Sequence, residues 1–308
     1  MPSSRVIVDV DGRRLGLSNL DKVLYPKTGT TKGEVIDYYT RIAPVLLPHL
    51  AGRPLTRKRW PNGVAEGSFF EKNAPKGTPE WVHTVELPSP GSSRGTESVT
   101  YVRCEDLPTL VWLANLAVLE LHVPQWRVEG TTPQNPDRLV LDLDPGPPAT
   151  IVECCQVAIA LAEALAADGL RCFPKTSGNK GLQAYVPLDG SAPVEDVHRY
   201  ARDLAERLEK KYPKLIVSRM DKSVRRRKVL IDWSQNNAAK TTVAPYSLRG
   251  RDEPTVSTPV TWDEVEATGG GQAPLQFDFA DVLDRVDAHG DLLAPLHDEA
   301  YALPSSTP

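Results

Sequence analysis

The feature that most constrains this 308-residue sequence is the alternation of short apolar runs with long amphipathic segments after residue 138. The run Arg138-Leu-Val-Leu-Asp-Leu-Asp144 is typical of a strand, and Thr150-Ile-Val-Glu153 has capping-box spacing for a helix that ends at Gly169. A second helix is expected at 194–211. Further strands are expected at 171–173, 182–186, 228–233 and 241–248. This pattern predicts a mixed α/β (α+β) fold with a central antiparallel or mixed sheet flanked by helices.

The chain before residue 130 carries other patterns. Apolar residues alternate over 6–17 on both sides of Asp11-Gly12, which indicates a β-hairpin. The segment 31–34 is a second capping box and opens an amphipathic helix. The apolar stretch 107–121 predicts a largely buried helix.

We therefore expect a single domain over 1–308. Its N-terminal lobe, about 1–130, packs against a sheet-based lobe, about 131–300, and 301–308 form a disordered tail.

Composition narrows the class of protein. The net charge of −4 argues against a general polyanion-binding surface, but the segment 219–228 holds six basic residues against one acid. The four cysteines show no C-x-x-C spacing, so neither a disulfide framework nor a cysteine zinc site is predicted. No apolar run approaches membrane-spanning length, and we expect a cytoplasmic protein without a membrane partner.

Three acidic residues follow apolar strand-like runs. Asp142 and Asp144 alternate with leucines, so both project to the same side of their strand. Asp232 ends the run Val229-Leu230-Ile231 in the same manner. Three carboxylates on neighbouring strands suit two divalent cations, Mg²⁺ or Mn²⁺, in the arrangement used for phosphoryl transfer. Alone, a D-x-D pair favours a simpler interpretation, namely a strand end whose acids face solvent or cap the next helix.

Three further segments could contact phosphate or nucleic acid. The turn 176–181 offers glycine backbone, a hydroxyl and a lysine, as a phosphate site or a plain polar turn. His122 follows an apolar segment and has a structural alternative. Phe69 and Phe70 lie near basic residues 57–59, and could stack on bases or anchor their loop in the core.

Taken together, these segments resemble the polymerase domain of bacterial ligase D, a non-homologous end-joining enzyme of the archaeo-eukaryotic primase superfamily. The resemblance extends over nearly the whole chain. It rests on the blocks NLDKVLYP (19–26), RKRWPNG (57–63), FFEK (69–72), LELH (119–122), LDLDPG (141–146), TSGNKGL (176–182), IDWSQN (231–236) and APYSLR (244–249).

The resemblance implies a role for each matching residue, and a primase-polymerase-like sheet for the fold. The catalytic, metal-binding carboxylates would be Asp142, Asp144 and Asp232. The nucleotide contacts would be His122, Ser177, Lys180, Gln235 and Arg249. The contacts to a 5′-phosphate of DNA would be Asn19, Lys22 and Lys32. The contacts to template and DNA backbone would be Arg59, Phe69, Phe70, Lys72 and Arg225.

The implied activity is metal-dependent, template-directed nucleotide addition at gaps or broken DNA ends, with ribonucleotides used at least as well as deoxyribonucleotides. The substrates would be NTP or dNTP and gapped or broken duplex DNA with a 5′-phosphate. A separate DNA ligase and an end-binding protein would be partners at the nucleoid. A metal-dependent nuclease and a catalytically silent DNA-end-binding module are the alternatives.

Two positions depart from the family's usual Ser-Gly-Ser-Lys-Gly-Leu-His, namely Asn179 and Gln183. The ligase nucleophile motif Lys-x-Asp-Gly does not occur in the sequence, so we expect a stand-alone relative or an excised domain.

Overall fold

The apolar alternation around Asp11-Gly12 folds as the expected hairpin, because both turn residues adopt positive φ, 48° and 77°. The structure is a computed structural model that describes residues 5–88 and 97–304. The chain divides into two compact units. Unit 1 comprises Met1–Pro133, Val243–Val256 and Asp278–Gly290, and unit 2 comprises Gln134–Thr242, Ser257–Phe277 and Asp291–Pro308.

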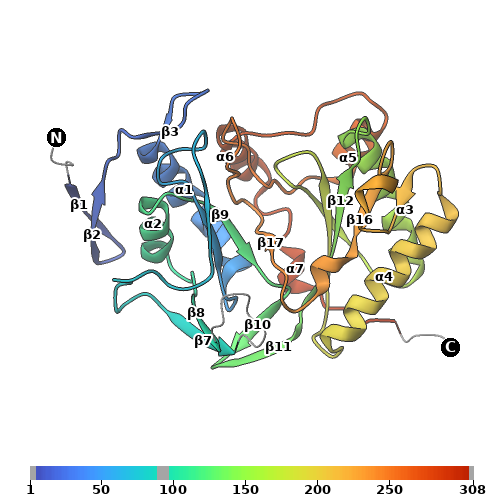
Figure 1. The fold of residues 1–308 in the computed structure, drawn as a ribbon, viewed down its shortest axis with the longest axis horizontal. Helices are drawn as coiled ribbons and strands as arrows, with labels where there is room; N and C mark the ends of the chain where they lie inside the picture. Colours follow the sequence, from blue (N-terminus) through green and yellow to red (C-terminus); the bar gives the residue numbers. More distant parts are fainter. Residues whose placement is uncertain (1–4, 89–96, 305–308) are drawn as a thin grey trace. The chain divides into compact units, whose positions relative to one another are not determined.

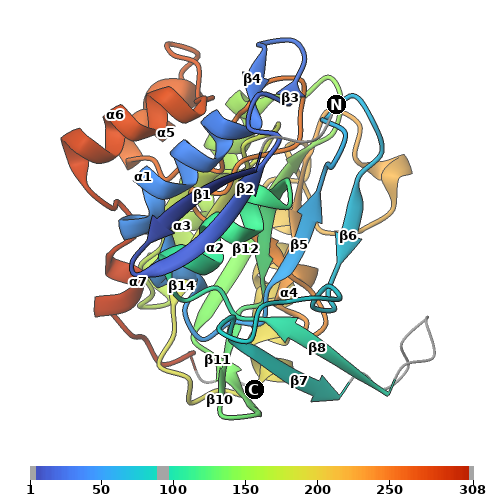
Figure 2. The same ribbon diagram turned by 90° about the vertical axis from the view of Figure 1, so that its left-hand side faces the viewer.

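Unit 1 is built around a four-stranded sheet in the order β17-β9-β5-β6. Strands β5 and β6 run side by side in Figure 2. The strands are β1 (Arg5–Val10), β2 (Arg13–Ser18), β3 (Val23–Tyr25), β4 (Thr30–Thr31), β5 (Thr56–Arg59), β6 (Phe69–Glu71), β7 (Thr84–Pro88), β8 (Ser98–Val102), β9 (Val118–Val123) and β10 (Trp126–Glu129). The helices are α1 (Lys32–Leu50), α2 (Leu107–Asn115) and α6 (Phe279–His289). Strands β11 (Thr132–Pro136) and β17 (Thr242–Val243) lie where the chain passes from one unit's range to the other's.

The prediction of a helix over 107–121 is correct for its first nine residues and wrong for 116–121. Helix α2 ends at Asn115, and Ala117 adopts a left-handed φ of 57° before the chain enters β9. Residues 118–122 pair with β5, so backbone hydrogen bonds to a neighbouring strand override the local apolar pattern. The strand expected over 241–248 is likewise shorter, and only β17 is extended there.

Unit 2 is built around a five-stranded sheet in the order β13-β14-β12-β16-β15. All neighbouring strands pair antiparallel except β15 with β16. The strands are β12 (Arg138–Pro145), β13 (Phe173–Thr176), β14 (Leu182–Pro187), β15 (Ile216–Val217) and β16 (Val229–Asp232). The helices are α3 (Ile151–Ala167), α4 (Val194–Lys211), α5 (Trp262–Gly269) and α7 (Pro295–Asp298), with short 3-10 helices η1 (Lys222–Val224) and η2 (Trp233–Asn236). The expected mixed α/β class is confirmed.

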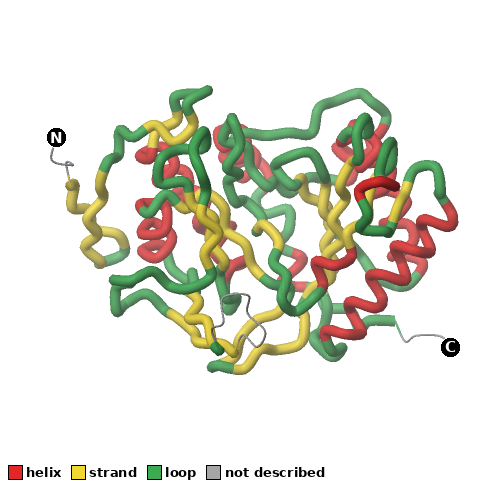
Figure 3. The backbone as a smooth tube through the Cα atoms, viewed as in Figure 1, coloured by secondary structure: helices red, strands yellow, loops and turns green. Residues whose placement is uncertain are grey.

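Helices α3 and α4 cover one face of this sheet, as Figures 1 and 3 show within unit 2. Leu139, Leu141 and Leu143 of β12 enter the same apolar core as the buried residues of both helices. Side chains alternate along a strand, so Asp142 and Asp144 lie on the other face. The core therefore fixes which face of the sheet carries the carboxylates.

The remaining expectations concern cysteines, the tail and membranes. All four cysteines are free and buried. The expected disorder of 301–308 does not hold at Tyr301, which forms a parallel bridge with Leu188, while 305–308 lie outside the described residues. Within residues 5–88 and 97–304, no helix combines the length and apolar character needed to cross a membrane.

Candidate active site

The three predicted carboxylates gather on neighbouring strands of unit 2. Asp142 stands directly opposite Asp232 in the antiparallel pairing of β12 with β16. Asp144 lies two residues further along β12 and projects to the same face. Residues directly opposite in an antiparallel pair have side chains about 5 Å apart. The sheet register therefore brings Asp232 beside Asp142 and Asp144, although it lies 90 and 88 residues after them in the sequence.

Asp142 is an electrostatically costly residue in this arrangement. Burial and the neighbouring carboxylates of Asp144 and Asp232 raise the pKa of Asp142 to about 7. Its Oδ1 atom is buried and has no hydrogen-bond partner in the described part of the chain. A buried carboxylate oxygen without a donor, beside two further carboxylates, fits the oxygen ligands that Mg²⁺ and Mn²⁺ prefer.

Asp232 is held in a fixed orientation by the residues that follow it. Its Oδ1 accepts hydrogen bonds from the backbone N–H and the hydroxyl of Ser234, at 2.9 and 2.6 Å. Its Oδ2 accepts from Nε2 of Gln235 at 3.1 Å. The structure thus places the predicted nucleotide contact Gln235 directly beside a predicted metal ligand.

Sequence reasoning missed a polar row that continues from the carboxylates across the sheet. Gln183 lies opposite Asp142 and hydrogen-bonds it, and Lys175 lies opposite Gln183 on the next strand. Both side chains are buried, and the charge of Lys175 opposes the rise in the pKa of Asp142. Gln183, which had been noted only as a departure from the family pattern, is therefore a neighbour of the carboxylates.

The turn after β13 packs against the carboxylate strand. Ser177 N–H donates to the carbonyl of Gly181 at 2.9 Å, and Ser177 Oγ accepts from the N–H groups of Asn179 and Gly181 at 3.3 and 3.2 Å. Gly181 approaches β12 so closely that a Cβ would lie 2.2 Å from the carbonyl oxygen of Leu143. The exposed side chain of Lys180 thus stands on a turn fixed to the strand of Asp142 and Asp144.

The basic segment 219–228 lies along the end of the same strand. A Cβ on Gly146 would lie 1.9 Å from the carbonyl oxygen of Arg225, and the Gly146 N–H donates to the carbonyl of Lys228 at 2.8 Å. The Arg225 guanidinium donates to the carbonyl of Met220 within its own loop. The backbone of Arg225 therefore lies next to the LDLDPG block.

In unit 1, Glu120 joins the two predicted nucleotide contacts His122 and Arg249. Glu120 and His122 are two positions apart on β9 and therefore point to the same face of the sheet. Oε2 of Glu120 lies 2.8 Å from Nε2 of His122. Oε1 of Glu120 accepts from Nε of Arg249 at 3.2 Å and from the N–H of Gly250 at 3.1 Å. Sequence reasoning missed Glu120 because it placed this residue on a helix, where positions two apart do not share a face.

The protonation states of this cluster follow from its burial and charges. Burial opposes ionisation of Glu120, but the hydrogen bond with His122 and the charge of Arg249 outweigh it and lower the pKa to about 2. Burial lowers the pKa of His122 below its ordinary value, Glu120 opposes this shift, and Arg249 and Lys58 add to it. Near neutral pH the carboxylate is ionised and the imidazole is neutral.

The predicted stacking residues lie on the edge strand β6. Phe69 and Phe70 expose 56% and 50% of their surfaces, so the alternative that they anchor their loop in the core is wrong. The Phe70 ring meets the His122 ring edge-on, with centroids 5.7 Å apart. Arg59 pairs with Phe69 across the strands, and Nη1 of Arg59 lies 3.4 Å from Glu71. Lys72 is half-buried directly after β6.

The predicted 5′-phosphate contacts also come together in unit 1. Asn19 adopts a left-handed φ of 54°, and its carbonyl accepts from the Lys22 N–H at 3.1 Å. Lys32 begins α1 behind a complete capping box and is 4% exposed, with its Nζ donating to the carbonyl of Asn115 at 2.9 Å. Burial and the charge of Lys22 lower the pKa of Lys32 to about 8. The two lysines are therefore close enough for their charges to repel each other.

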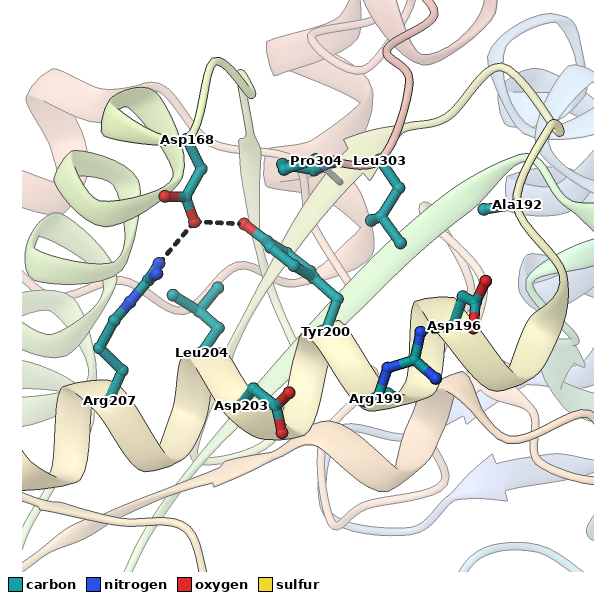
Figure 4. Close-up of a pocket in the computed structure, with 10 residues that line it drawn as sticks. All are labelled: Asp168, Ala192, Asp196, Arg199, Tyr200, Asp203, Leu204, Arg207, Leu303 and Pro304. Atoms are coloured by element: carbon teal, nitrogen blue, oxygen red, sulfur yellow. Dashed lines mark hydrogen bonds and ion pairs between the residues drawn. The ribbon is translucent and has the colours of Figure 1, made fainter. Parts of the chain in front are cut away.

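A further pocket on unit 2 contains none of the predicted site residues (Figure 4). Asp168 at the end of α3 accepts hydrogen bonds from Tyr200, at 2.8 Å, and from Arg207 of α4. Arg199 pairs with Asp196 on the same helix. These contacts join α3 to α4.

Comparison with known protein families gives a match over most of the chain. The model of the family described as LigD, primase-polymerase domain, matches residues 31–293. The multifunctional non-homologous end joining protein LigD of Mycolicibacterium smegmatis is 50% identical over 287 residues, which is 93% of this chain and 36% of that protein. The bifunctional LigD of Bacillus subtilis is 33% identical over 278 residues, 90% of this chain and 43% of that protein. The chain thus spans less than half the length of these relatives.

A solved structure agrees with these sequence matches. The polymerase domain of Mycobacterium tuberculosis ligase D in complex with DNA superposes with a TM-score of 0.87 and 44% sequence identity. The match covers 94% of this chain and 99% of that one.

Proposed function

Because this chain belongs to the LigD primase-polymerase domain family, we propose that it is a metal-dependent, template-directed nucleotidyltransferase. It adds nucleotides at gaps or broken ends of DNA during repair by end joining. The observation that carries the proposal is Asp142 facing Asp232 across β12 and β16, with a buried Oδ1 that lacks a hydrogen-bond donor in the described chain. Such a group has little structural use without a cation.

In this proposal Asp142, Asp144 and Asp232 hold two divalent cations, Mn²⁺ or Mg²⁺. When bound, these cations would activate the primer 3′-hydroxyl and neutralise charge on the triphosphate and on the departing pyrophosphate. Ser234 and Gln235 keep Asp232 oriented through the hydrogen bonds to both of its oxygens. The turn carrying Ser177 and Lys180 supplies a hydroxyl and a positive charge to the triphosphate.

The remaining proposed contacts lie on unit 1. His122 contacts the sugar of the nucleotide, and Arg249 contributes positive charge. Asn19, Lys22 and Lys32 bind the 5′-phosphate of gapped DNA, because their two clustered ammonium groups suit a doubly charged anion. Phe69 and Phe70 stack on template bases, since both rings are exposed. Arg59, Lys72 and Arg225 follow the DNA backbone.

The deciding experiment is extension of a labelled primer on gapped, 5′-phosphorylated DNA with Mn²⁺ or Mg²⁺, using ribo- or deoxyribonucleotides. Nucleotide-dependent lengthening is expected, with ribonucleotides used at least as well as deoxyribonucleotides. Shortening of the primer would instead identify a nuclease, and binding without any change in length would identify a silent end-binding module. No observation favours either alternative. We further propose that the protein acts at the nucleoid with a separate DNA ligase and an end-binding protein.

A further inference from the structure

The two carboxylate oxygens of Glu120 have three hydrogen-bond partners, and these partners differ in whether they can donate, accept or do either. Nε of Arg249 and the backbone N–H of Gly250 can only donate, and both donate to Oε1. The other oxygen, Oε2, lies 2.8 Å from Nε2 of His122. A neutral imidazole carries its proton on one nitrogen and accepts at the other, so His122 alone among the three has a choice.

The ionised carboxylate of Glu120 determines which ring nitrogen of His122 carries the proton. An ionised carboxylate is acceptor-only, so the proton of a neutral His122 must be on Nε2 for this contact to be a hydrogen bond. The opposite nitrogen, Nδ1, then carries a lone pair and can only accept. In the part of the chain that the structure describes, the hydrogen bond recorded for the His122 ring is the one to Glu120.

The surroundings of the ring favour a fixed orientation. His122 exposes 13% of its side chain and Glu120 exposes 3%. The Phe70 ring contacts the imidazole edge-on. Gly250, which donates to Glu120, packs against the Trp60 ring so closely that a Cβ would lie 2.1 Å from it, which leaves room only for glycine. The charged groups that act on the imidazole are Glu120, Arg249 and Lys58. A ring held this way presents one nitrogen in one direction.

We propose that Glu120 is a positioning residue that fixes the tautomer of His122, so that Nδ1 accepts a hydrogen bond from the 2′-hydroxyl of the incoming nucleotide. Glu120 thereby determines sugar specificity without touching the substrate. The same carboxylate orients Arg249, which links recognition of the sugar to the charge that the site offers the triphosphate. This inference rests on the proposed polymerase function, and its first test does not.

The first test is the proton position on His122 in the wild-type protein, read from long-range ¹H–¹⁵N NMR spectra of the imidazoles near neutral pH. The chain has six histidines, and His122→Asn identifies the signal by its disappearance. We expect a neutral ring protonated on Nε2. A ring protonated on Nδ1, or a charged ring, would overturn the proposal whether or not the protein is a polymerase.

Glu120→Gln provides the second test. A glutamine has a single acceptor oxygen, which the obligate donors Arg249 and Gly250 require, so its NH₂ group must face His122. The NH₂ group donates to Nε2 and moves the imidazole proton to Nδ1. We expect this inversion in the NMR spectrum. Glu105→Gln is the matched control, because Glu105 pairs with His83 at 3.1 Å in the same unit and its replacement should leave the His122 signals unchanged.

The third test measures kcat/KM for nucleotides with a 2′-hydroxyl and with a 2′-fluorine, which cannot donate. The wild type should favour the hydroxyl by about three- to tenfold, the size of one net hydrogen bond. In both Glu120→Gln and His122→Asn this preference should fall, and the double variant should lower it no further. Loss of Arg249 orientation would reduce both nucleotides equally and leave the ratio unchanged.

The outcomes separate a positioning role from a merely structural one. A Glu120→Gln protein that keeps the wild-type ratio and tautomer would refute the proposal. If that variant fails to fold, the wild-type spectrum and the His122→Asn ratio still decide it. A wild type that does not extend primers at all, yet shows the Nε2-protonated ring, would refute the proposed function and leave the tautomer assignment intact.

Discussion

Asp142 shows, at the scale of a single residue, how a candidate active site works against the stability of the fold. Its side chain is half-buried beside Asp144 and Asp232, and its Oδ1 is buried without a donor among the described residues. Like charges and desolvation both disfavour this arrangement in the absence of a cation. Residues that are costly to the fold and suited to a ligand are the expected mark of function.

Asp142→Asn should therefore raise the melting temperature of the metal-free protein, because it removes a buried charge that two neighbouring carboxylates repel. The same substitution should abolish primer extension and remove most of the stabilisation that Mn²⁺ gives. Thermal unfolding with and without Mn²⁺ measures both effects. Asp144→Asn is the matched control, since the exposed Asp144 should yield a smaller gain in the metal-free protein. A metal-free Asp142→Asn protein less stable than the wild type would contradict this account.

Lys32 gives a prediction for pH. Its folded-state pKa of about 8 lies below the ordinary value of 10.5, so its charge costs stability below about pH 8, and this cost disappears as the pH rises toward 10.5. Discrimination between 5′-phosphate and 5′-hydroxyl gapped DNA needs the charged form. The affinity ratio of the two DNAs should thus fall as the pH rises through about 8.

The comparison of wild type with Lys32→Met isolates this group. The variant should be more stable than the wild type near neutral pH and should show a small affinity ratio at every pH. A wild-type ratio that stays constant between about pH 7 and pH 9 would exclude Lys32 as the phosphate-sensing charge.

At the scale of elements, two segments that carry predicted site residues pack directly against the carboxylate strand β12. The turn 177–181 and the basic segment 219–228 both approach β12 through glycines, Gly181 and Gly146, whose missing side chains allow backbone contact. Close approach of this kind explains glycine at these positions better than backbone flexibility does, because neither has a left-handed φ.

Gly181→Ala should push the phosphate turn away from β12, since the new Cβ would lie 2.2 Å from a backbone oxygen. We expect a rise in the KM for nucleotides of about tenfold or more, and a loss of stability of about 1–3 kcal/mol, the usual range for overpacking. Gly67→Ala is the control, because a Cβ there meets no atom within 4 Å. Equal behaviour of the two variants in kinetics and in chemical denaturation would show that the turn does not depend on this contact.

For the whole molecule, each compact unit is assembled from segments that are far apart in the sequence. Unit 1 takes most of its residues from Met1–Pro133 but also uses Val243–Val256 and Asp278–Gly290. The buried Tyr38 hydroxyl donates to the carbonyl of Tyr246 at 2.7 Å, and the Tyr39 hydroxyl accepts from the Leu248 N–H at 3.2 Å. The core of unit 1 is therefore completed by residues more than 200 positions away.

A fragment of residues 1–133 should consequently fail to form a cooperative folded state. It lacks the carbonyl that accepts from the buried Tyr38 hydroxyl, the Leu248 N–H that donates to the Tyr39 hydroxyl, and the ring of Phe279, which packs 5.9 Å from that of Tyr38. Each unsatisfied buried group costs about 1–3 kcal/mol, a large share of the stability of a small unit. Circular dichroism and thermal unfolding of the fragment, beside the full chain, measure this. A sharp unfolding transition in the fragment would show that unit 1 is autonomous.

Local chemistry determined much of this protein from the sequence alone. The capping boxes at Thr31 and Thr150 located α1 and α3, and the alternation of leucine with aspartate located β12 and the side of it that carries charge. These signals succeed because they depend on neighbours within four residues, where helix caps and strand alternation are set.

Only the tertiary structure decided what depends on pairing between distant segments. Residues 116–121 read as the end of a helix, yet pairing with β5 makes 118–123 a strand, and that change alone places Glu120 beside His122. The row of Lys175 and Gln183 next to Asp142 likewise depends on the register of three strands, and the contact of Glu120 with Arg249 joins residues 129 positions apart. Hydrogen bonds between strands are non-local, so a pattern read along the chain carries no information about which residue stands opposite which.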